Sequence, residues 1–257
     1  MKNTTRILTL ALAVVMLVGA VFCFASCGQK DDQKATLKMG TNAYFPPYEY
    51  YEGGEIVGID AEIAAKIAEK IGMELEIVDM EFDSIITSVE TDVVAMGMAG
   101  MTVTDERLLQ VDFTSSYATG IQVVIVKEGS AITTVDDLFA EGASYKVGVQ
   151  LGTTGDIYAC LDLGEDSVVK FDKGADAVEA LKIGDVDCVL IDNEPAKSFV
   201  SANTGLVILD TAYAVEEYAI AIKKGNTDLL NKINTALEEL IADGTVADIV
   251  AKYIPAN

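Results

Sequence analysis

The chain of 257 residues carries 18 Lys and Arg against 41 Asp and Glu, which gives a formal net charge of −23 at pH 7, and it contains no histidine. An apolar content of 51% predicts a folded chain of one large or two medium domains. The negative charge argues against nucleic-acid binding, which needs clustered Lys and Arg. The lack of histidine removes the commonest general base and metal ligand. We therefore expect neither a metal site nor a cofactor, and enzymes are disfavoured without being excluded.

The N-terminus has the pattern of an export signal. Lys2 and Arg6 precede an uncharged apolar run over residues 7–25. The same run could instead anchor the chain in a membrane, since about 20 apolar residues span a bilayer. The choice between the two depends on the residues that follow.

Residues 24–28, with the sequence FASCG, resemble a bacterial lipobox that ends at Cys27, and Cys23 is a weaker alternative. We predict a lipoprotein signal peptide over residues 1–26, lipidation of Cys27 and a polar tether over residues 27–36. Such a protein lies outside the cytoplasmic membrane, in a periplasm or on the outer face of the cell, and is held there by lipid.

The first half of the chain alternates strand-like and helix-like patterns. Ile63, Ile67 and Ile71 recur every four residues and predict a helix that Gly72 ends. In chain order we predict a strand over 37–41, a loop over 42–54, a helix over 60–71, a strand over 75–78, a helix over 83–89, a strand over 93–98 and a short helix capped by Thr104 or Asp105.

The second half continues the alternation and ends in two amphipathic helices. In chain order we predict a strand over 121–126, a helix over 135–139, a strand over 146–149, a helix after Thr154, a strand over 168–171, a helix over 175–183, a strand over 188–191, a helix over 194–201, a strand over 218–222 and helices over 229–240 and 246–253. This alternation predicts an α/β protein whose sheets are mostly parallel.

Two strongly apolar strands separate the α/β sets and predict two lobes. Residues 121–126 and 218–222 would be the crossovers between the lobes. The first lobe would then comprise residues 37–121 and 218–257, and the second, inserted lobe would comprise residues 122–217. Ligand sites in such folds lie at the carboxyl ends of strands and between domains.

Residues 100–107, with the sequence GMTVTDER, have the features of a clamp for a small carboxylate. Gly100 lets a ligand approach the backbone, Thr102 offers a hydroxyl, and the guanidinium of Arg107 matches a carboxylate bidentately. From this stretch alone, an equally good interpretation is a turn followed by a surface arginine that pairs with Asp105 or Glu106, an interaction of about 0–1 kcal/mol.

Several motifs are spread along the chain. The main ones are GTNAYFPPYE at 40–49, GIDAEIA at 58–64, and residues 100–107 followed by VDFT at 111–114; weaker ones are GVQLGTTG at 148–155, LID at 190–192 and ADGT at 242–245. Together they resemble the motifs of the polar-amino-acid family of bacterial extracellular solute-binding proteins, family 3, the receptors of ABC importers. One region departs, because ETD at 90–92 replaces the family's usual turn.

The resemblance implies a two-lobed periplasmic-binding-protein fold of type II, with two hinge crossovers. Each lobe would be a mostly parallel sheet flanked by helices. It also implies that a free amino acid binds between the lobes, that the hinge closes on it, and that the closed form docks on an ABC importer permease in the membrane. We expect a monomer that catalyses no reaction.

The resemblance also implies roles for residues at the two charged ends of a zwitterion. Arg107, with Thr102, would bind the α-carboxylate, and Thr153 and Thr154 would add donors from the other lobe near a helix N-terminus. Asp192 would bind the α-ammonium together with the Gly100 carbonyl. Asp192 could equally serve as the N-cap of the helix that follows it, or do both.

The remaining predicted site residues concern the ligand side chain. Phe45 and Phe82 match positions that sandwich the ligand, although core packing is the commoner role of a phenylalanine. Asn42 stands where relatives that bind cations often carry Asp, so we predict a neutral polar ligand, and Gln150 weakly supports this. Met101 completes the predicted set, between Gly100 and Thr102.

Two other functions are compatible with parts of the sequence. A dehydratase-like enzyme on the same fold, acting on a cyclic carboxylic acid, would need an acid or base such as Glu49, Glu81 or Asp192. A receptor's sensing module would need a further membrane span, and no long apolar run follows Ala25.

Export permits a disulfide, but we favour a free, buried thiol at Cys188, while its pairing with Cys160 stays open. Cys160 and Cys188 are the two cysteines beyond residue 27.

Overall fold

The computed structural model describes residues 34–255. The predicted signal peptide, Cys27 and most of the predicted tether therefore lie outside the described residues. All the elements below belong to the unit Ala35–Asn257. Within residues 34–255 we find no helix with the length and apolar character needed to cross a membrane.

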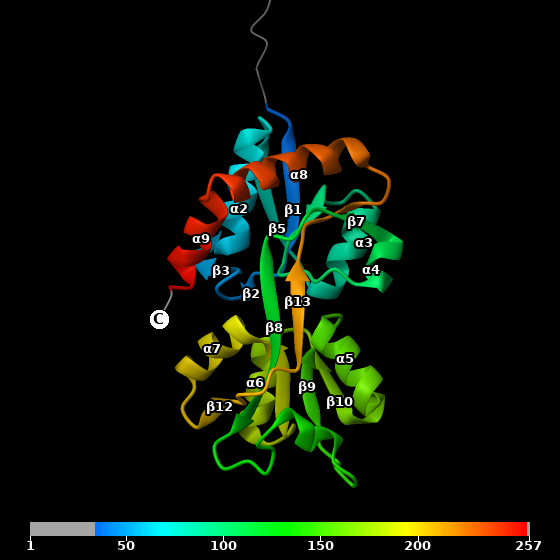
Figure 1. Ribbon diagram of the computed structural model, residues 1–257, viewed down its shortest axis with the longest axis vertical. Helices are drawn as coiled ribbons and strands as arrows, with labels where there is room; N and C mark the ends of the chain where they lie inside the picture. The colour runs from blue at the N-terminus through cyan, green and yellow to red at the C-terminus, as the bar shows by residue number, and fades with distance from the viewer. Residues whose placement is uncertain (1–33, 256–257) are drawn as a thin grey trace, which may run out of the picture. The chain divides into compact units, whose positions relative to one another are not determined.

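The first lobe is built on a five-stranded sheet (Figure 1). Its strands are β1 (Thr36–Thr41), β5 (Glu74–Asp79), β6 (Met96–Gly97), β7 (Val111–Phe113) and β14 (Ala221–Lys223). Their order in the sheet is β5-β1-β6-β14-β7. β1 runs parallel to β5 and β6, whereas β14 runs antiparallel to β6 and β7.

Helices cover both faces of this sheet. They are α2 (Ile59–Lys70), α3 (Ile85–Glu90), α4 (Asp105–Gln110), α8 (Thr227–Ala242) and α9 (Thr245–Tyr253). Ile220 and Ile222 pack in one cluster with α2, α8 and α9, while Ala221 packs in a second cluster with α3. Because successive strand residues point to opposite faces, this alternation buries the sheet on both sides.

The second lobe is built on a six-stranded sheet. Its strands are β8 (Ala118–Lys127), β9 (Val147–Gln150), β10 (Val168–Phe171), β11 (Cys188–Asp192), β12 (Leu206–Ile208) and β13 (Ala214–Tyr218), and its helices are α5 (Thr154–Leu163), α6 (Gly174–Ile183) and α7 (Asn193–Ala202). The order is β10-β9-β11-β8-β12, with β13 also paired to β8. β9 runs parallel to β10 and β11, and β8 runs antiparallel to β11, β12 and β13.

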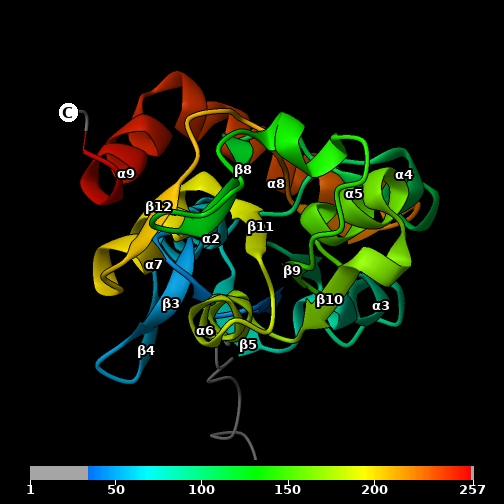
Figure 2. The same cartoon turned by 90° about the horizontal axis from the view of Figure 1, so that it is seen from below.

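The helices of the second lobe also pack on both faces of its sheet (Figure 2). Val189 and Ile191 of β11 pack in one cluster with α6 and α7 residues, whereas Cys188 and Leu190 pack in another with Ala159 of α5. Both cysteines of the described chain are free, and Cys188 is fully buried, as predicted. Because β11 packs against helices on both of its faces, its last residue, Asp192, is held in a defined position.

The two connections between the sheets lie side by side. β8 and β13 pair from Gln122 with Ala214 to Ala118 with Tyr218, and the Tyr117 amide then donates to the Tyr218 carbonyl over 2.9 Å. In Figure 1, β8 runs from the first lobe into the second, and the antiparallel β13 runs back towards the first lobe. The strand predicted over 218–222 is in fact divided, because β13 ends at Tyr218 and β14 begins at Ala221 in the other sheet.

Some predicted elements differ in the structure. The loop predicted over 42–54 contains two strands of an antiparallel sheet made of β2 (Tyr44–Phe45), β3 (Glu49–Glu52) and β4 (Glu55–Val57). The strand predicted over 93–98 is confined to β6, since Val93 is 58% exposed and follows a turn in which Asp92 has a φ of 59°. Tight turns and short strands lack the periodicity that reveals longer elements.

The remaining differences concern strand direction and helix type. Both sheets are mixed, since the crossover strands join the parallel strands antiparallel. The predicted helix over 83–89 begins as a 3-10 turn, Phe82–Ser84, before α3, and Val135–Phe139 is a 3-10 helix. β12 and β13 were not predicted, and β13 is the strand that brings Tyr218 beside β8.

Candidate functional site

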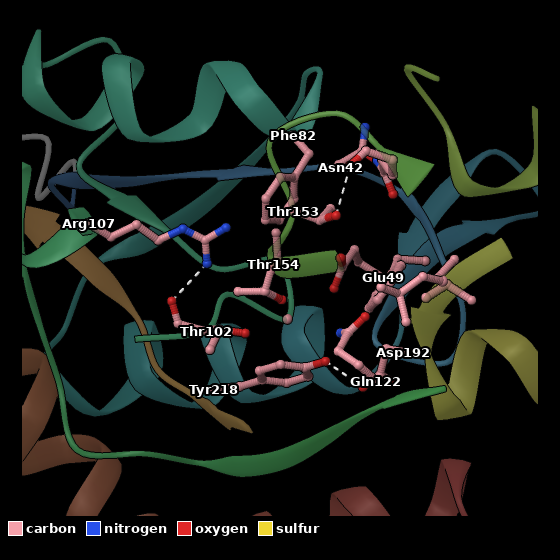
Figure 3. Close-up of a pocket in the computed structure, with 16 residues that line it drawn as sticks. Asn42, Glu49, Phe82, Thr102, Arg107, Gln122, Thr153, Thr154, Asp192 and Tyr218 are labelled. Atoms are coloured by element: carbon pink, nitrogen blue, oxygen red, sulfur yellow. Dashed lines mark hydrogen bonds between the residues drawn. The ribbon is translucent and has the colours of Figure 1, made fainter. Parts of the chain in front are cut away.

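A cavity is lined by residues of both lobes (Figure 3). Apart from Met101, every predicted site residue lines it: Asn42, Phe45, Phe82, Gly100, Thr102, Arg107, Gln150, Thr153, Thr154 and Asp192. Residues that we did not place in the site also line it, namely Glu49, Ala99, Gln122, Leu190, Ile191 and Tyr218. In Figure 3, Arg107 lies on one side, and Glu49, Gln122 and Asp192 lie on the opposite side.

Met101 does not line this cavity. Its side chain is fully buried in the cluster that contains Ile85, Val89 and Val111. Its carbonyl accepts a hydrogen bond from the Ala219 amide over 3.0 Å. Since side chains on an extended segment alternate in direction, the neighbours of a residue that faces a cavity face away from it. Met101 therefore supports the segment and offers no side-chain contact to a ligand.

Arg107 forms the cationic end of the cavity. It lies on α4, whose N-cap is Thr104, because the Thr104 Oγ1 accepts from the Arg107 amide over 3.2 Å. The side chain donates from Nη1 to the Thr102 carbonyl over 2.7 Å and from Nη2 to the Gly152 carbonyl over 3.0 Å. Its Cζ lies 5.4 Å from the centroid of the Phe82 ring.

The charge of Arg107 is not neutralised by an ion pair. Arg107 is 4% exposed, and none of the ion pairs among residues 34–255 includes it. The alternative of a surface arginine paired with Asp105 or Glu106 is therefore wrong. Burial lowers the pKa of Arg107, partly offset by the Glu216 carboxylate. A guanidinium held by neutral carbonyls in a buried place would be stabilised by an incoming anion.

The threonines near Arg107 are already partly hydrogen-bonded. Thr102 Oγ1 donates to Glu216 over 3.1 Å. Thr153 Oγ1 donates to the Gln150 carbonyl and accepts from the Asp156 amide, which makes it the N-cap of α5. The α5 N-terminus thus reaches the cavity at Thr153 and Thr154. Its positive dipole favours a negative group at the end of the cavity where Arg107 lies.

Asp192 forms the acidic end, and it does serve as an N-cap. Its Oδ1 accepts from the Glu194 amide over 3.1 Å, which caps α7. Its Oδ2 accepts from the Ile121 amide over 3.0 Å and from the Tyr218 hydroxyl over 2.6 Å. Burial nevertheless raises the pKa of Asp192 to about 6. A cation in the cavity would therefore favour the ionised form of this carboxyl.

Sequence reasoning missed three polar residues that line the acidic end. Glu49 was considered only as a base for the enzyme alternative, although it ends the motif at 40–49. Gln122 was the one polar residue inside an apolar crossover strand, which is a usable signal; it donates from Nε2 to Glu216 over 3.0 Å. Tyr218 had no such signal, because it was the first residue of a strand predicted as continuous.

The residues expected to contact the ligand side chain also contact each other. Asn42 Nδ2 donates to the Met80 carbonyl over 2.8 Å, and its Oδ1 accepts from Gln150 Nε2 over 3.0 Å, across the two lobes. Phe45 lies against Gly100, where an added Cβ would come within 3.1 Å of the ring and where φ is +53°. This left-handed conformation favours glycine, and a side chain here would also meet the Phe45 ring, so the close approach depends on Gly100.

The fold and the sequence agree with one family of known proteins. The family model described as bacterial extracellular solute-binding proteins, family 3, matches residues 37–256. The chain belongs to this family. Members of the family are solute-binding receptors and work outside the cytoplasmic membrane. The resemblance predicted from the motifs, and with it the two-lobed α/β fold, is thereby confirmed.

Individual relatives bind different amino acids. The chain is 32% identical to the arginine-binding extracellular protein ArtP of Bacillus subtilis, over 93% of this chain and 96% of the relative. It is 30% identical to the L-cystine-binding protein TcyJ of Escherichia coli, over 96% and 94%. Among solved structures, an ancestral arginine-binding protein bound to glutamine has a TM-score of 0.81 and 39% identity, and the match covers 87% of this chain and 99% of that one.

Proposed function

We propose that the protein is a lipid-anchored, extracytoplasmic receptor that captures one free amino acid in this cavity and delivers it to an ABC importer permease. The observation that carries the proposal is the buried, unpaired guanidinium of Arg107 facing the Asp192 carboxylate across one cavity. An α-amino acid carries one anion and one cation, and burying either of them unpaired would be prohibitive. Arg107 would pair with the ligand carboxylate, and Asp192 would pair with the ligand ammonium.

Capture would close the hinge. Arg107 belongs to the first lobe and Asp192 to the second, so a ligand that contacts both favours the closed form by its differential affinity. Two contacts already cross the lobes in this structure, from Arg107 to Gly152 and from Gln150 to Asn42. No bond of the ligand needs to break, and the permease would recognise the closed form of a monomeric receptor.

We further propose that the ligand is a neutral polar amino acid. Arg107 and Asp192 use both charges of the backbone zwitterion, and the other polar groups around the cavity include the amides of Asn42, Gln122 and Gln150. Cystine, bound by one relative, and glutamine, bound in one similar structure, are ligands of this class. Arginine, bound by another relative, is not.

The enzyme alternative finds less support. Of its three candidate acids or bases, Glu81 is exposed and does not line the cavity. Asp192 already accepts three hydrogen bonds, and Glu49 lies among acidic groups, with no Lys or Arg paired to it among residues 34–255. We therefore propose binding without catalysis.

Thermal melting of the mature protein against single amino acids tests this function. A ligand at 100 times its dissociation constant adds about 2.7 kcal/mol to the free energy of unfolding, which raises the melting temperature by several degrees. Hits among neutral polar amino acids support the whole proposal. Hits confined to arginine and lysine retain the receptor and reject the ligand class. No hit with any amino acid rejects the function.

Lipid anchoring needs a separate test. Metabolic labelling of the full chain with a radioactive fatty acid should mark the wild-type protein, and Cys27→Ser should lose the label. Label that persists in Cys27→Ser and is lost in Cys23→Ser would move the anchor to Cys23.

A further inference from the structure

Two carboxyl groups at the acidic end are buried without enough hydrogen-bond donors, and their backbones meet, because the Asp60 amide donates to the carbonyl of Tyr48, the residue before Glu49, over 2.9 Å. Glu49, on β3, is 0% exposed, and neither of its oxygens has a partner among the described residues. Asp60, in the first turn of α2, is also 0% exposed, and its Oδ1 has no partner. Its Oδ2 accepts from the Gly100 amide over 2.9 Å and from the Tyr117 hydroxyl over 2.8 Å. Buried polar atoms are rarely left unsatisfied.

The charged surroundings of the pair are negative. Asp192 acts on Glu49 through its charge, and the hydroxyls of Tyr48, Tyr117 and Tyr218 are the other titratable groups nearby. No ion pair of residues 34–255 joins a Lys or Arg to Glu49 or Asp60. Two adjacent carboxylates without a cation cannot both stay ionised away from water.

One proton between the two groups supplies a hydrogen-bond partner to two of these three oxygens. If Glu49 is protonated, it donates a hydrogen bond to Asp60, and atoms of both residues gain a partner at once. Burial, followed by the Asp60 charge, raises the pKa of Glu49 well above its usual range. Burial raises the pKa of Asp60 to about 6, opposed by the hydrogen bonds from Gly100, Tyr117 and Glu49. Glu49 therefore holds the proton, and Asp60 accepts from it.

We propose that Glu49 and Asp60 share one proton in the ligand-free protein, and that this proton sets the charge of the ligand side chains that the cavity accepts. Glu49, which lines the cavity, is a neutral hydrogen-bonding group while the proton is held. A cationic side chain binds only when the proton leaves to solvent, which gives Glu49 a negative charge to pair with it. This proposal rests on the proposed function and adds how the site discriminates between side chains.

Proton release can be measured by calorimetry of L-arginine and L-glutamine binding at pH 7.5, in phosphate and in Tris. The two buffers differ in ionisation enthalpy, so the difference in binding heat gives the number of protons released. We expect about one more proton released per arginine than per glutamine. Between about pH 7 and 8.5, where Asp192 stays ionised, the arginine affinity should rise roughly tenfold per pH unit and the glutamine affinity should stay nearly constant.

Two variants distinguish the pair from other sources of protons. Glu49→Gln keeps the shape of the protonated side chain, and we expect it to abolish the extra proton and to lower the ratio of arginine to glutamine affinity at least about tenfold. Glu52→Gln makes the same change at an exposed position of the same strand and should leave the proton count unchanged. Asp60→Asn is the second test if Glu49→Gln does not fold.

The ligand-free protein provides a measurement that needs no amino acid. Its infrared spectrum at pH 7 should show the carbonyl stretch of a protonated carboxylic acid, and Glu49→Gln should lose it. Absence of this band in the wild type overturns the shared proton. Arginine binding without extra proton release, or no arginine binding at any pH at which glutamine binds, overturns the control of ligand charge. If neither amino acid nor any other binds, the proposed function itself is wrong.

Discussion

The two ends of the cavity hold their charges in different ways. Arg107 is fixed by the neutral carbonyls of Thr102 and Gly152, so its charge has no counterion in the described chain. At the acidic end, Asp192 lies near the pair Glu49 and Asp60, and burial raises the pKa of all three carboxyls. A charge oriented by dipoles stays available to a ligand, whereas crowded carboxylates bind protons. Ligand binding at the cationic end should therefore change with substitution alone, whereas ligand binding at the acidic end should change with both substitution and pH.

Arg107→Ala tests the cationic end and should have the largest effect. Without the guanidinium, the ligand carboxylate would be buried unpaired, so we expect binding to weaken by at least about 4 kcal/mol, roughly a thousandfold. The α4 cap uses the Arg107 amide, which alanine keeps, so the fold should survive. Calorimetry with the best ligand of the melting panel measures the loss, and circular dichroism checks the fold.

Arg107→Lys is the matched control for charge. Lysine keeps the cation but loses the planar fork that donates to two carbonyls. An intermediate loss would show that both charge and geometry matter. Near-normal affinity in Arg107→Ala would remove Arg107 from the site.

Asp192→Asn tests the acidic end at neutral pH. The amide cannot neutralise the ligand ammonium, so we expect a loss of about 2–4 kcal/mol in binding. Glu194→Gln is the control, since it is the next carboxylate along the chain and its ion pair with Lys197 lies at the surface. Equal losses in the two variants would mean that the general negative charge of this region, and no direct contact, attracts the ligand.

The residues of the cationic end could be placed together from the sequence, whereas the pair Glu49 and Asp60 at the acidic end could not, and the reason is physical. Arg107 and Thr102 lie five residues apart in one short motif, so local sequence was enough to place them together. Glu49 and Asp60 also lie in recognisable motifs, but their proximity depends on the turn between β3 and α2. Whether a carboxyl is ionised depends on burial and on its neighbours in space, which no local pattern encodes.

The fold shows the same division between local and long-range information. The α2 helix was predicted within a residue at each end from the spacing of Ile63 and Ile67. The strand predicted over 218–222 was apolar throughout, and nothing local shows that the chain changes sheets after Tyr218. Because that change places Tyr218 against Asp192, the same failure hid a residue of the site.

Stability should depend on pH through the acidic end. Burial raises the pKa values of Asp60 and Asp192 to about 6, so the folded protein binds more protons than the unfolded chain between about pH 4 and 6. The contribution of these groups is fully present below about pH 4 and is lost as the pH rises through 6, by at most about 3 kcal/mol per group. Thermal melting of the ligand-free protein from pH 4.5 to 7 measures the fall.

Bound ligand should reduce this pH dependence. Its ammonium favours ionised Asp192, which lowers the pKa of that carboxyl towards its usual value. Melting curves with saturating ligand should therefore fall less steeply over the same range. An identical fall with and without ligand would contradict a contact between the ammonium and Asp192.

Tyr218→Phe tests how Asp192 is positioned. The variant removes only the hydroxyl that donates to Asp192 Oδ2 over 2.6 Å. A hydrogen bond to a charged group contributes about 1.5–3 kcal/mol, and part of this should appear as weaker ligand binding. Tyr213→Phe is the control, because its hydroxyl donates to Asp162, which lies outside the cavity. Equal affinity in the two variants would show that Asp192 holds its position without Tyr218.

Asn42→Ala should have the smallest effect and distinguishes two roles for this residue. Its amide oxygen accepts from Gln150 across the lobes, so it contributes to the closed form whatever the ligand is. If this is its role, the variant should weaken every ligand by about 1 kcal/mol, the usual contribution of one hydrogen bond. If Asn42 instead contacts the ligand side chain, as the sequence suggested, the loss should be larger for amides than for small neutral amino acids.

A double-mutant cycle with Gln150→Ala separates these roles. In a cross-lobe contact, the second substitution adds little to the first, so the two losses couple by about 1 kcal/mol for each ligand tested. Direct contact of each residue with the ligand predicts a coupling energy that changes with the ligand. Additive losses would place the two side chains in independent roles, and closure would then depend on Arg107 and Asp192 through the ligand that joins them.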